Sequence, residues 1–389
     1  KILFAHQVAS IESVHNKKKN LVVTTGTGSG KSYCFMIPLL LNLLKESVGS
    51  DGRRQWNGEA TRNNYQWWES TRSPFQPKRT TTNRTSAVRA LLMYPLNALV
   101  QDQVESLRTI LHSKEAESYY SSVLGGDRIF FGQYSGLSPG NGDRTNADRL
   151  QSCREEFVRI DETSRSIGED NSIQKLQGSE LISRWDMQDH PPDILITNFS
   201  MLAVMMVRAI ETNIFESTRR WLAESPANVF YLVLDELHSY RGTGGTEISY
   251  VIKTFLDRIG LTPEHPQLRI ICTSASLEDS GDGKTDPRFL KDFFGISSKT
   301  PIFDTIQGTL DERKPLTIEA CNQLTPELAK LSMNQDPDVF AEVCEKIRDV
   351  LGLQKSLSSS DVLEFAGVHD TLLHLSNELR LKAKHASEL

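Results

Sequence analysis

A glycine-rich segment with a single lysine lies between two apolar stretches near the start of the chain. It reads Thr25-Gly26-Thr27-Gly28-Ser29-Gly30-Lys31-Ser32 and directly follows the apolar stretch 20–24. Glycines let the backbone curl so that successive N–H groups point inward at phosphate oxygens. Lys31 supplies a cation for the β- and γ-phosphates, and the Ser32 hydroxyl is a ligand for Mg²⁺. The segment predicts a phosphate-binding loop, with a glycine-rich turn that binds nothing as the alternative, since Thr25 stands where the strict pattern has glycine.

Two adjacent carboxylates end another apolar stretch, in the sequence Val233-Leu234-Asp235-Glu236-Leu237-His238. Hydrolysis of a nucleoside triphosphate needs a carboxylate near Mg²⁺ and a second group that handles the attacking water. We assign the first role to Asp235 and the second, as general base, to Glu236. His238 is expected to connect the site to another segment by a hydrogen bond. The alternative is a solvated turn, which the preceding apolar stretch disfavours.

Six short apolar stretches have the length of buried strands, and helical patterns separate them. Strands are expected at 20–24, 90–94, 128–132, 193–197, 229–234 and 268–273, and helices at 32–44, 99–111, 150–160 and 248–259. Strands that alternate with helices predict an α/β fold with a mainly parallel sheet. The glycine-rich segment and the carboxylate pair then lie at one edge of that sheet, where its strands end.

Two polar stretches, at about 49–88 and 136–190, interrupt this pattern and are predicted to be insertions in a lobe that spans 1–309. The first mixes basic and aromatic side chains, which suits single-strand binding by charge and stacking. The alternative is a solvated loop whose Trp residues cover a hydrophobic patch or a partner surface. The side chains concerned are Arg53, Arg54, Arg62, Arg72, Lys78, Arg79 and Arg84 with Trp56, Trp67 and Trp68. Residues 310–389 are expected to form helices only.

Composition excludes some classes of protein. The 389 residues carry 44 Lys and Arg against 50 Asp and Glu, a net charge of −6. This balance argues against a strongly basic nucleic-acid wrapper but allows a local basic surface. No apolar stretch approaches the roughly 18 residues of a membrane span, and we expect no signal peptide. The five cysteines show no C-x-x-C spacing, so we expect a reduced, cytoplasmic protein without a zinc site.

Taken together, residues 1–309 resemble the first lobe of a DExH-type helicase of superfamily 2. His6-Gln7 is similar to the adenine-reading Q-motif, the segment 25–32 to motif I and Asp235 to His238 to motif II. Three further matches are Tyr94-Pro95-Leu96-Asn97-Ala98-Leu99-Val100-Gln101-Asp102-Gln103 to motif Ia, Thr197-Asn198-Phe199-Ser200-Met201-Leu202 to motif Ib, and Ser274-Ala275-Ser276 to motif III. In motif III, Ser276 replaces threonine and keeps the hydroxyl.

Motif II continues as Ser239-Tyr240-Arg241-Gly242-Thr243-Gly244-Gly245. This tail resembles helicases of the Hrq1 and Lhr types, which are associated with a DUF1998 region. The large bacterial anti-phage helicases of the DISARM and Druantia systems are similar and also carry long insertions. The resemblance therefore adds a role in anti-phage defence to the expectations.

The resemblance implies a RecA-like lobe that binds ATP and Mg²⁺. Gln7 and the segment 25–32 would bind the nucleotide, Ser32 and Asp235 would hold Mg²⁺, and Ser274, Ala275 and Ser276 would couple the site to movement. The implied nucleic-acid contacts are Asn97, Thr197, Asn198 and Arg241, together with the stretch Gln133-Tyr134-Ser135-Gly136. A helix cap is the alternative role for Thr197-Asn198. DNA is expected in preference to RNA.

Two elements of such helicases are not found in this sequence. No Q-x-x-G-R-x-x-R stretch supplies the arginine finger of motif VI, and no four-cysteine cluster is present. The chain also begins at Lys1 rather than Met. We therefore expect a second lobe beyond Leu389 and little activity from this lobe alone. The expected function is that of an ATP-dependent helicase or translocase. The alternative is a nucleic-acid-activated ATPase that acts as a scaffold or switch in a defence or restriction complex without unwinding.

Overall fold

The computed structural model describes residues 3–25, 30–48, 65–79, 84–95, 97–168, 170–240, 243–274, 287–297 and 303–307. The chain divides into two compact units, and the larger, His6–Gly308, contains the whole of the sheet. The helices predicted beyond residue 310 lie outside the described residues. Within the described residues, no helix has both the length and the apolar character needed to cross a membrane.

One seven-stranded sheet, parallel at every pairing, forms the centre of this unit, in the order β3-β4-β2-β5-β6-β1-β7. Its strands are β1 (Asn20–Thr24), β2 (Ala90–Tyr94), β3 (Phe131–Gln133), β4 (Ile194–Asn198), β5 (Phe230–Leu234), β6 (Leu268–Ser274) and β7 (Phe303–Gln307). The predicted α/β fold with a mainly parallel sheet is confirmed. The sequence did not predict β7, because its residues are only partly buried at the edge of the sheet and form no apolar run.

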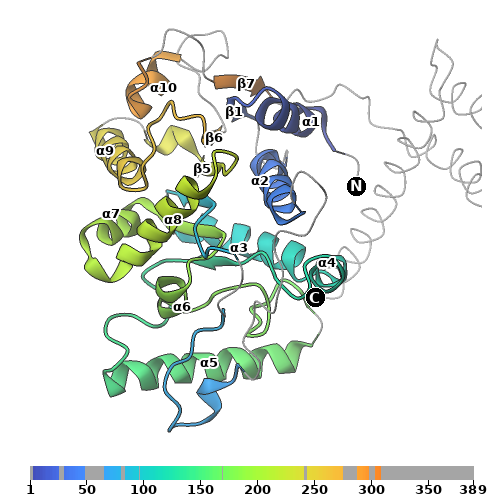
Figure 1. The fold of residues 1–389 in the computed structure, drawn as a ribbon, viewed down its shortest axis with the longest axis vertical. Helices are drawn as coiled ribbons and strands as arrows, with labels where there is room; N and C mark the ends of the chain where they lie inside the picture. Colours follow the sequence, from blue (N-terminus) through green and yellow to red (C-terminus); the bar gives the residue numbers. More distant parts are fainter. Residues whose placement is uncertain are drawn as a thin grey trace, which may run out of the picture. The chain divides into compact units, whose positions relative to one another are not determined.

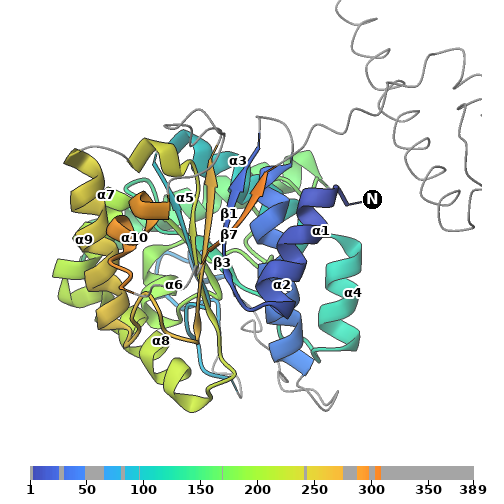
Figure 2. The ribbon, with the colours of Figure 1, turned by 90° about the horizontal axis from the view of Figure 1, so that it is seen from above.

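Helices cover both faces of the sheet (Figures 1 and 2). One face carries α1 (Ala5–Ile11), α2 (Lys31–Val48), α3 (Asn97–Leu111) and α4 (Lys114–Ser122). The other carries α6 (Arg184–Asp189), α7 (Phe199–Val207), α8 (Thr212–Glu224), α9 (Thr243–Arg258) and α10 (Pro287–Phe294). Coverage on both sides explains why the central strands are apolar at nearly every position rather than at alternate ones.

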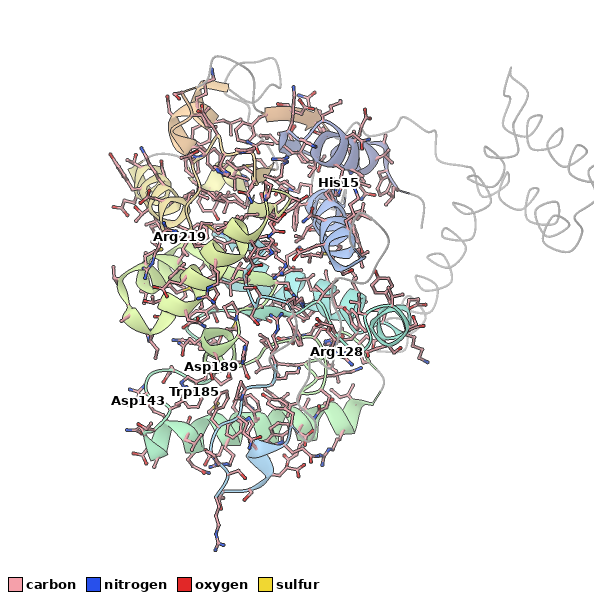
Figure 3. All side chains as sticks on the ribbon, in the orientation of Figure 1. His15, Arg128, Asp143, Trp185, Asp189 and Arg219 are labelled. Atoms are coloured by element: carbon pink, nitrogen blue, oxygen red, sulfur yellow. The ribbon has the colours of Figure 1, made fainter. Side chains whose placement is uncertain are left out.

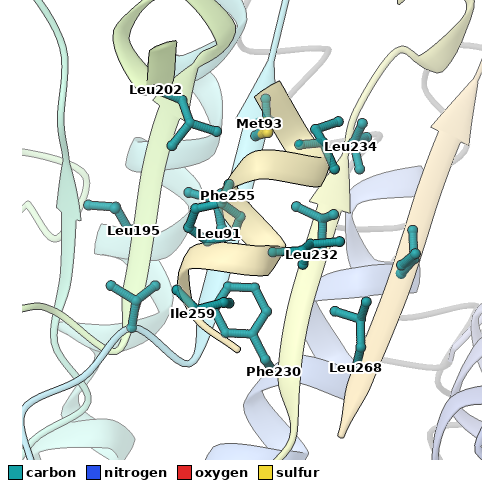
Figure 4. Packing of buried hydrophobic residues seen from close by; sticks show 14 of the residues in the cluster. Leu91, Met93, Leu195, Leu202, Phe230, Leu232, Leu234, Phe255, Ile259 and Leu268 are labelled. Carbon is teal, nitrogen blue, oxygen red and sulfur yellow. The ribbon is translucent and has the colours of Figure 1, made fainter. Parts of the chain in front are cut away.

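Alternate residues of each strand enter two separate hydrophobic clusters. In β2, Leu91 and Met93 pack with Leu195 and Phe255 on the face of α7 and α9, as Figure 4 shows. Leu92, between them, enters the cluster on the face of α2 and α3. This two-residue period fixes the register of each strand, since a shift by one residue would exchange the two faces.

Aromatic side chains from the two predicted insertions form a third cluster. Trp67 and Trp68 lie with their ring centroids 5.1 Å and 5.5 Å from that of Phe157 in α5 (Ala147–Ile167). Trp185 of α6 joins this cluster, and Figure 3 shows it close to α5. Both tryptophans are buried and cover a hydrophobic patch, as the alternative to single-strand binding supposed, but the described part of the first insertion packs against the second and is not a solvated loop.

Charged residues at the amino ends of the strands form a buried network. Asp193 precedes β4 and pairs with Arg84 and with Arg89, whose Nη1 lies 3.0 Å from Asp193 Oδ1. Arg84 Nε lies 3.0 Å from Asp127 Oδ2, and Arg89 Nη2 lies 2.6 Å from Glu46 Oε1. Burial alone would raise the pKa of Asp193, but the arginines outweigh it and bring the pKa to about 2. Arg84, one of the side chains for which single-strand binding was weighed against a loop role, is therefore an internal anchor of the first insertion.

Candidate active site

The end of the glycine-rich segment lies at the carboxyl edge of the sheet, between β1 and α2. Residues 26–29 lie outside the described residues, but Thr25 and Gly30 on either side of them are described. The Thr25 N–H donates to the Ser274 carbonyl over 3.3 Å, which ties the segment to the end of β6. Lys31 begins α2, and its Nζ lies 3.2 Å from Glu236 Oε1. The sheet thus brings together two residues that are 205 positions apart in the sequence.

Asp235 and Glu236 follow β5 directly and turn back over the edge of the sheet. The Asp235 N–H donates to the Met93 carbonyl over 3.1 Å, and the Thr273 hydroxyl donates to Asp235 Oδ1. Glu236 has a φ of 52°, and its N–H donates to Asp235 Oδ1 over 3.0 Å. A left-handed conformation is costly for a residue with a side chain. Here it makes the chain turn sharply, and the neighbouring carboxylates both remain near Lys31.

Burial raises the pKa of Asp235 above that of an ordinary aspartate. The hydrogen bond from Thr273 opposes this shift, and the nearby charge of Glu236 adds to it. A carboxylate that is costly to ionise gains most when a cation binds it, because the cation restores the charge balance lost with water. This environment fits a ligand for a divalent cation.

The side chains also fit the chemistry of Mg²⁺ with a nucleotide. Ser32 and Asp235 are oxygen ligands of the kind that Mg²⁺ prefers, and this ion usually keeps only one or two protein ligands beside phosphates and water. In the part of the chain that the structure describes, no cluster of three or more His, Cys, Asp or Glu able to hold a metal occurs. Bound there, Mg²⁺ would neutralise charge on the phosphates.

A partly buried glutamine amide lies next to Ser32. Gln103 of α3 donates from Nε2 to Ser32 Oγ over 2.8 Å. Its Oε1 is buried and has no hydrogen-bond partner among the described residues. Buried polar atoms are nearly always paired, so an unpaired one beside a phosphate loop indicates that a ligand completes the site.

His238 links the carboxylate pair to β6. Its Nδ1 lies 3.2 Å from Glu236 Oε2 and 3.3 Å from Ser274 Oγ, and its side chain is 40% exposed. The predicted connection of His238 to another segment therefore has a geometric counterpart, through Ser274. Ala275 and Ser276, the other residues predicted to couple the site, lie outside the described residues.

Gln7 of α1 packs against the start of α2. Its Nε2 donates to the Gly30 carbonyl over 3.2 Å, and the side chain is buried. Gly30 has a φ of 74°, and a Cβ at this position would lie 2.7 Å from Gln7 Nε2. Glycine is therefore favoured at residue 30 by its backbone conformation, and the end of the Gln7 side chain would have to move to make room for a Cβ. The residue predicted to read adenine lies directly beside the predicted phosphate loop.

Some of the residues predicted to contact nucleic acid have side chains that the structure describes. Those side chains make hydrogen bonds within the protein. The buried Thr197 hydroxyl donates to the Tyr134 carbonyl over 2.8 Å. Asn198 Oδ1 accepts from the Met201 N–H over 2.8 Å and caps α7, the alternative role considered for it above. Asn97 begins α3, but its side chain is outside the described set, as is Arg241.

Two residues of the site were missed by sequence reasoning. Gln103 was noted only as part of the stretch 94–103, although its spacing places it on the side of α3 that faces the sheet, beside Val104. Thr273 was read as part of an apolar strand, and its hydroxyl reaches Asp235 only because β6 lies next to β5. A polar residue at the carboxyl end of a buried strand was the available signal for Thr273.

Comparison with known proteins agrees with this geometry. Residues 4–131 match the model of the DEAD/DEAH box helicase family. The Druantia protein DruE of Escherichia coli is 30% identical over 91% of this chain. An uncharacterized ATP-dependent helicase of Methanocaldococcus jannaschii is 24% identical over 71% of the chain. The chain spans 20% of the length of the first relative and 26% of the second.

Among solved structures, the chain is similar to the DUF1998 helicase MrfA bound to DNA, with a TM-score of 0.42 and 18% identity over 91% of this chain and 37% of that one. It is also similar to the DEAD-box helicase Mss116 bound to single-stranded RNA and UDP-BeF, with a TM-score of 0.41 and 13% identity over 85% of this chain and 47% of that one.

Proposed function

We propose that this chain, whose residues 4–131 carry a DEAD/DEAH box helicase domain of superfamily 2, is the ATP-binding lobe of an ATP-dependent nucleic-acid helicase or translocase. The observation that carries the proposal is the 3.2 Å contact between Lys31 Nζ and Glu236 Oε1 at the carboxyl edge of the sheet. A phosphate-binding lysine and a carboxylate that can accept a proton from water meet there. Asp235 and Ser32, the two proposed Mg²⁺ ligands, are the sequence neighbours of these two residues.

Each side chain has a role in this proposal. Lys31 exchanges its contact with Glu236 for the β- and γ-phosphates of ATP, which frees the Glu236 carboxylate to accept a proton from the attacking water. Gln7 holds the adenine, and the backbone N–H groups of residues 25–32 bind the phosphates. His238 relays the state of Glu236 to Ser274 and, through the segment 274–276, to the movement of the lobe.

The nucleic acid is proposed to cross the ends of β2, β3 and β4. Asn97, Thr197, Asn198 and Arg241 are the proposed contacts. Because the described side chains of Thr197 and Asn198 serve the fold, backbone N–H groups at the start of α7 are the better candidates there. We take the substrate to be DNA rather than RNA, as the resemblance of the motif II tail to helicases of the Hrq1 and Lhr types implies.

The cellular setting is part of the same proposal. Likeness over 91% of the chain to a protein of the Druantia system supports a role in bacterial anti-phage defence. The proposed partners are other proteins of that system, and the proposed location is the cytoplasm. Residues 1–309 would form the lobe and 310–389 a helical region leading to a second RecA-like lobe. Since the chain spans a fifth of that relative, the motor would need the remainder to turn over efficiently.

The test measures ATP hydrolysis by the full-length protein with and without single-stranded DNA. We expect DNA to stimulate hydrolysis and Lys31→Ala to abolish it. Lys45→Ala, on the same helix but exposed and remote from the carboxylates, is the matched control and should behave as the wild type. Hydrolysis that ignores both nucleic acid and Lys31→Ala would contradict the proposal. Stimulated hydrolysis without strand displacement would favour the scaffold or switch over the helicase.

A further inference from the structure

The contact between Gln103 and the phosphate loop joins two elements with different proposed partners. Gln103 lies on α3, 71 positions beyond Ser32, and donates its amide N–H to the Ser32 hydroxyl oxygen over 2.8 Å. The other half of the amide, Oε1, is buried without a partner among the described residues. A buried amide with one unpaired end costs free energy unless another state of the protein pairs it.

The hydroxyl of Ser32 indicates what that other state is. A serine hydroxyl has one proton and two lone pairs, and here one lone pair accepts the hydrogen bond from Gln103. When the same oxygen binds a cation, its proton must point away from the cation and needs an acceptor. Rotation of the Gln103 amide by half a turn brings Oε1 to that proton. One side chain can therefore pair with Ser32 as a donor without the cation and as an acceptor with it.

The helix that carries Gln103 also reaches the other side of the lobe. Gln101, two residues earlier, donates from Nε2 to Gln133 Oε1 over 3.4 Å, at the end of β3. Asn97 begins the same helix. Residues 97 and 133 both belong to stretches proposed to lie along the nucleic acid. Thus α3 (Asn97–Leu111) connects Ser32 at one side to these stretches at the other.

We propose that Gln103 is a positioning residue that orients the Ser32 hydroxyl for Mg²⁺ and makes cation binding depend on the position of α3. The inference rests on the proposed function, because it presumes a nucleotide at the loop. It adds a link from the strand-facing helix to the cation ligand. Movement of α3 by an ångström would break a hydrogen bond of 2.8 Å and leave the Ser32 proton without its acceptor.

The test uses this chain and a fluorescent ATP analogue, with binding measured in EDTA and along a Mg²⁺ titration. Gln103→Leu keeps the approximate size but removes both amide atoms, whereas Gln103→Glu keeps an acceptor. We expect Gln103→Leu to raise the half-saturating Mg²⁺ concentration roughly three- to tenfold, the effect of one hydrogen bond, with binding in EDTA unchanged. Gln103→Glu should stay at or below the wild-type concentration.

Gln101→Leu and Gln101→Glu are the matched controls, since Gln101 is exposed on the same helix and contacts Gln133 instead of Ser32. Both should keep the wild-type Mg²⁺ dependence. A role of Gln103 in packing alone predicts the reverse order of the two variants in the Mg²⁺ titration. A charged glutamate in this partly buried position would then disturb the site more than a leucine of similar size does. That reverse order, or an unchanged Mg²⁺ dependence in Gln103→Leu, would overturn the inference alone. Failure of the wild-type chain to bind the analogue under any condition would overturn the proposed function, and the inference with it.

Discussion

Charged residues lie at both edges of the sheet, but they are buried and paired at the amino edge and partly exposed at the carboxyl edge. At the amino edge, the side chains of Asp127 and Asp193 are 0% exposed, and those of Arg84 and Arg89 are 4% and 1% exposed. They pair with one another. At the carboxyl edge, Lys31 is 11% exposed, Glu236 20% and His238 40%. A buried amide oxygen there, in Gln103, has no partner among the described residues. The carboxylates of the amino edge are paired with the protein's own arginines, whereas the carboxyl edge is left to be completed by a ligand.

The pKa values separate the two edges as well. Arginines bring the pKa of Asp193 to about 2 against the effect of burial, so this carboxylate stays ionised and bonded. Burial raises the pKa of Asp235, because its neighbours do not offset the loss of water. A carboxylate with too little positive charge around it is a candidate for function, and one with enough is a candidate for structure. The number of charged residues at each edge would not by itself have distinguished these two carboxylates.

The largest expected effect is on stability, at the amino edge. Asp193→Asn removes the charge that faces both Arg84 and Arg89, and leaving buried charges without their partner costs roughly 3–5 kcal/mol. Urea unfolding of the variant and the wild type measures this loss. Asp161→Asn, in a surface pair with Arg165, is the matched control and should change stability by less than about 0.5 kcal/mol.

If Asp193→Asn does not fold, Asp127→Asn provides the second measurement, since it removes one partner of Arg84 and leaves Asp193 in place. It should destabilise the protein by less than Asp193→Asn, and ATP affinity of the folded variant should be unchanged. Stability equal to that of the wild type in both variants would show that the amino edge is not a structural network.

The second effect is on binding, at the carboxyl edge. Lys31→Ala should weaken ATP binding roughly ten- to hundredfold, the value of a hydrogen bond to a charged group. Its unfolding free energy should change by less than about 1 kcal/mol, because the pair with Glu236 is partly exposed. Calorimetric titration with ATP and urea unfolding of the same sample check both parts. A large loss of stability with intact ATP binding would reverse the roles assigned to the two edges.

A smaller effect, a gain rather than a loss of stability, is expected from substitution of Asp235. Asp235→Asn removes a buried charge but keeps an oxygen that can accept from Thr273. In the absence of ligand it should stabilise the chain at neutral pH, by about 1 kcal/mol, while Mg²⁺ no longer strengthens nucleotide binding. Thermal unfolding with and without Mg²⁺ and ATP measures both. Destabilisation of the ligand-free chain would show that Asp235 is paired like the carboxylates of the amino edge.

The smallest expected effect is on how stability depends on pH. The folded pKa of Asp193, about 2, lies below the ordinary value of 3.8, so its contribution to stability is present above pH 3.8 and is lost as the pH falls toward 2. The folded pKa of Asp235 is raised, so acidification through that pKa removes a cost instead. The stability difference between Asp235→Asn and the wild type should therefore shrink as the pH falls from 7 toward 4. A difference that grows over this range would contradict the sign given for Asp235.

The sequence predicted most of the sheet because its strands are covered on both faces. The predicted bounds of 20–24 and 90–94 agree with β1 and β2, and 268–273 is one residue short of β6. The strand expected at 128–132 begins three residues later, since Asp193 binds the N–H of Phe130 before β3 starts. Strand β7 lacks an apolar run. The helix α8, which buries Ile214, Phe215 and Trp221, lies in a stretch for which no element was predicted.

Only the residues of the site that belong to sequence motifs could be predicted. The residue types of 25–32 and 235–238 indicated phosphate and carboxylate chemistry, and the sheet brings Lys31 to Glu236. Gln103 and Thr273 could not be assigned, because their roles depend on which strand and helix become neighbours. The roles of three basic residues of the first insertion could not be assigned for the same reason, and Arg53, Arg54 and Arg62 lie outside the described residues. Lys78, Arg79 and Arg84 are buried, and their hydrogen-bond partners are 43 or more positions away in the sequence. The residues next to them in the sequence therefore do not indicate that they are paired.

The affinity of Glu236→Gln for ATP in the presence of Mg²⁺ tests most directly whether Lys31 and Glu236 form one nucleotide site. In the structure the Glu236 carboxylate holds the Lys31 ammonium at 3.2 Å, so Glu236 competes with phosphate for that cation. The uncharged amide of glutamine competes less. The account predicts that Glu236→Gln binds ATP severalfold more tightly than the wild type in calorimetric titration. Binding as weak as that of Lys31→Ala would contradict it.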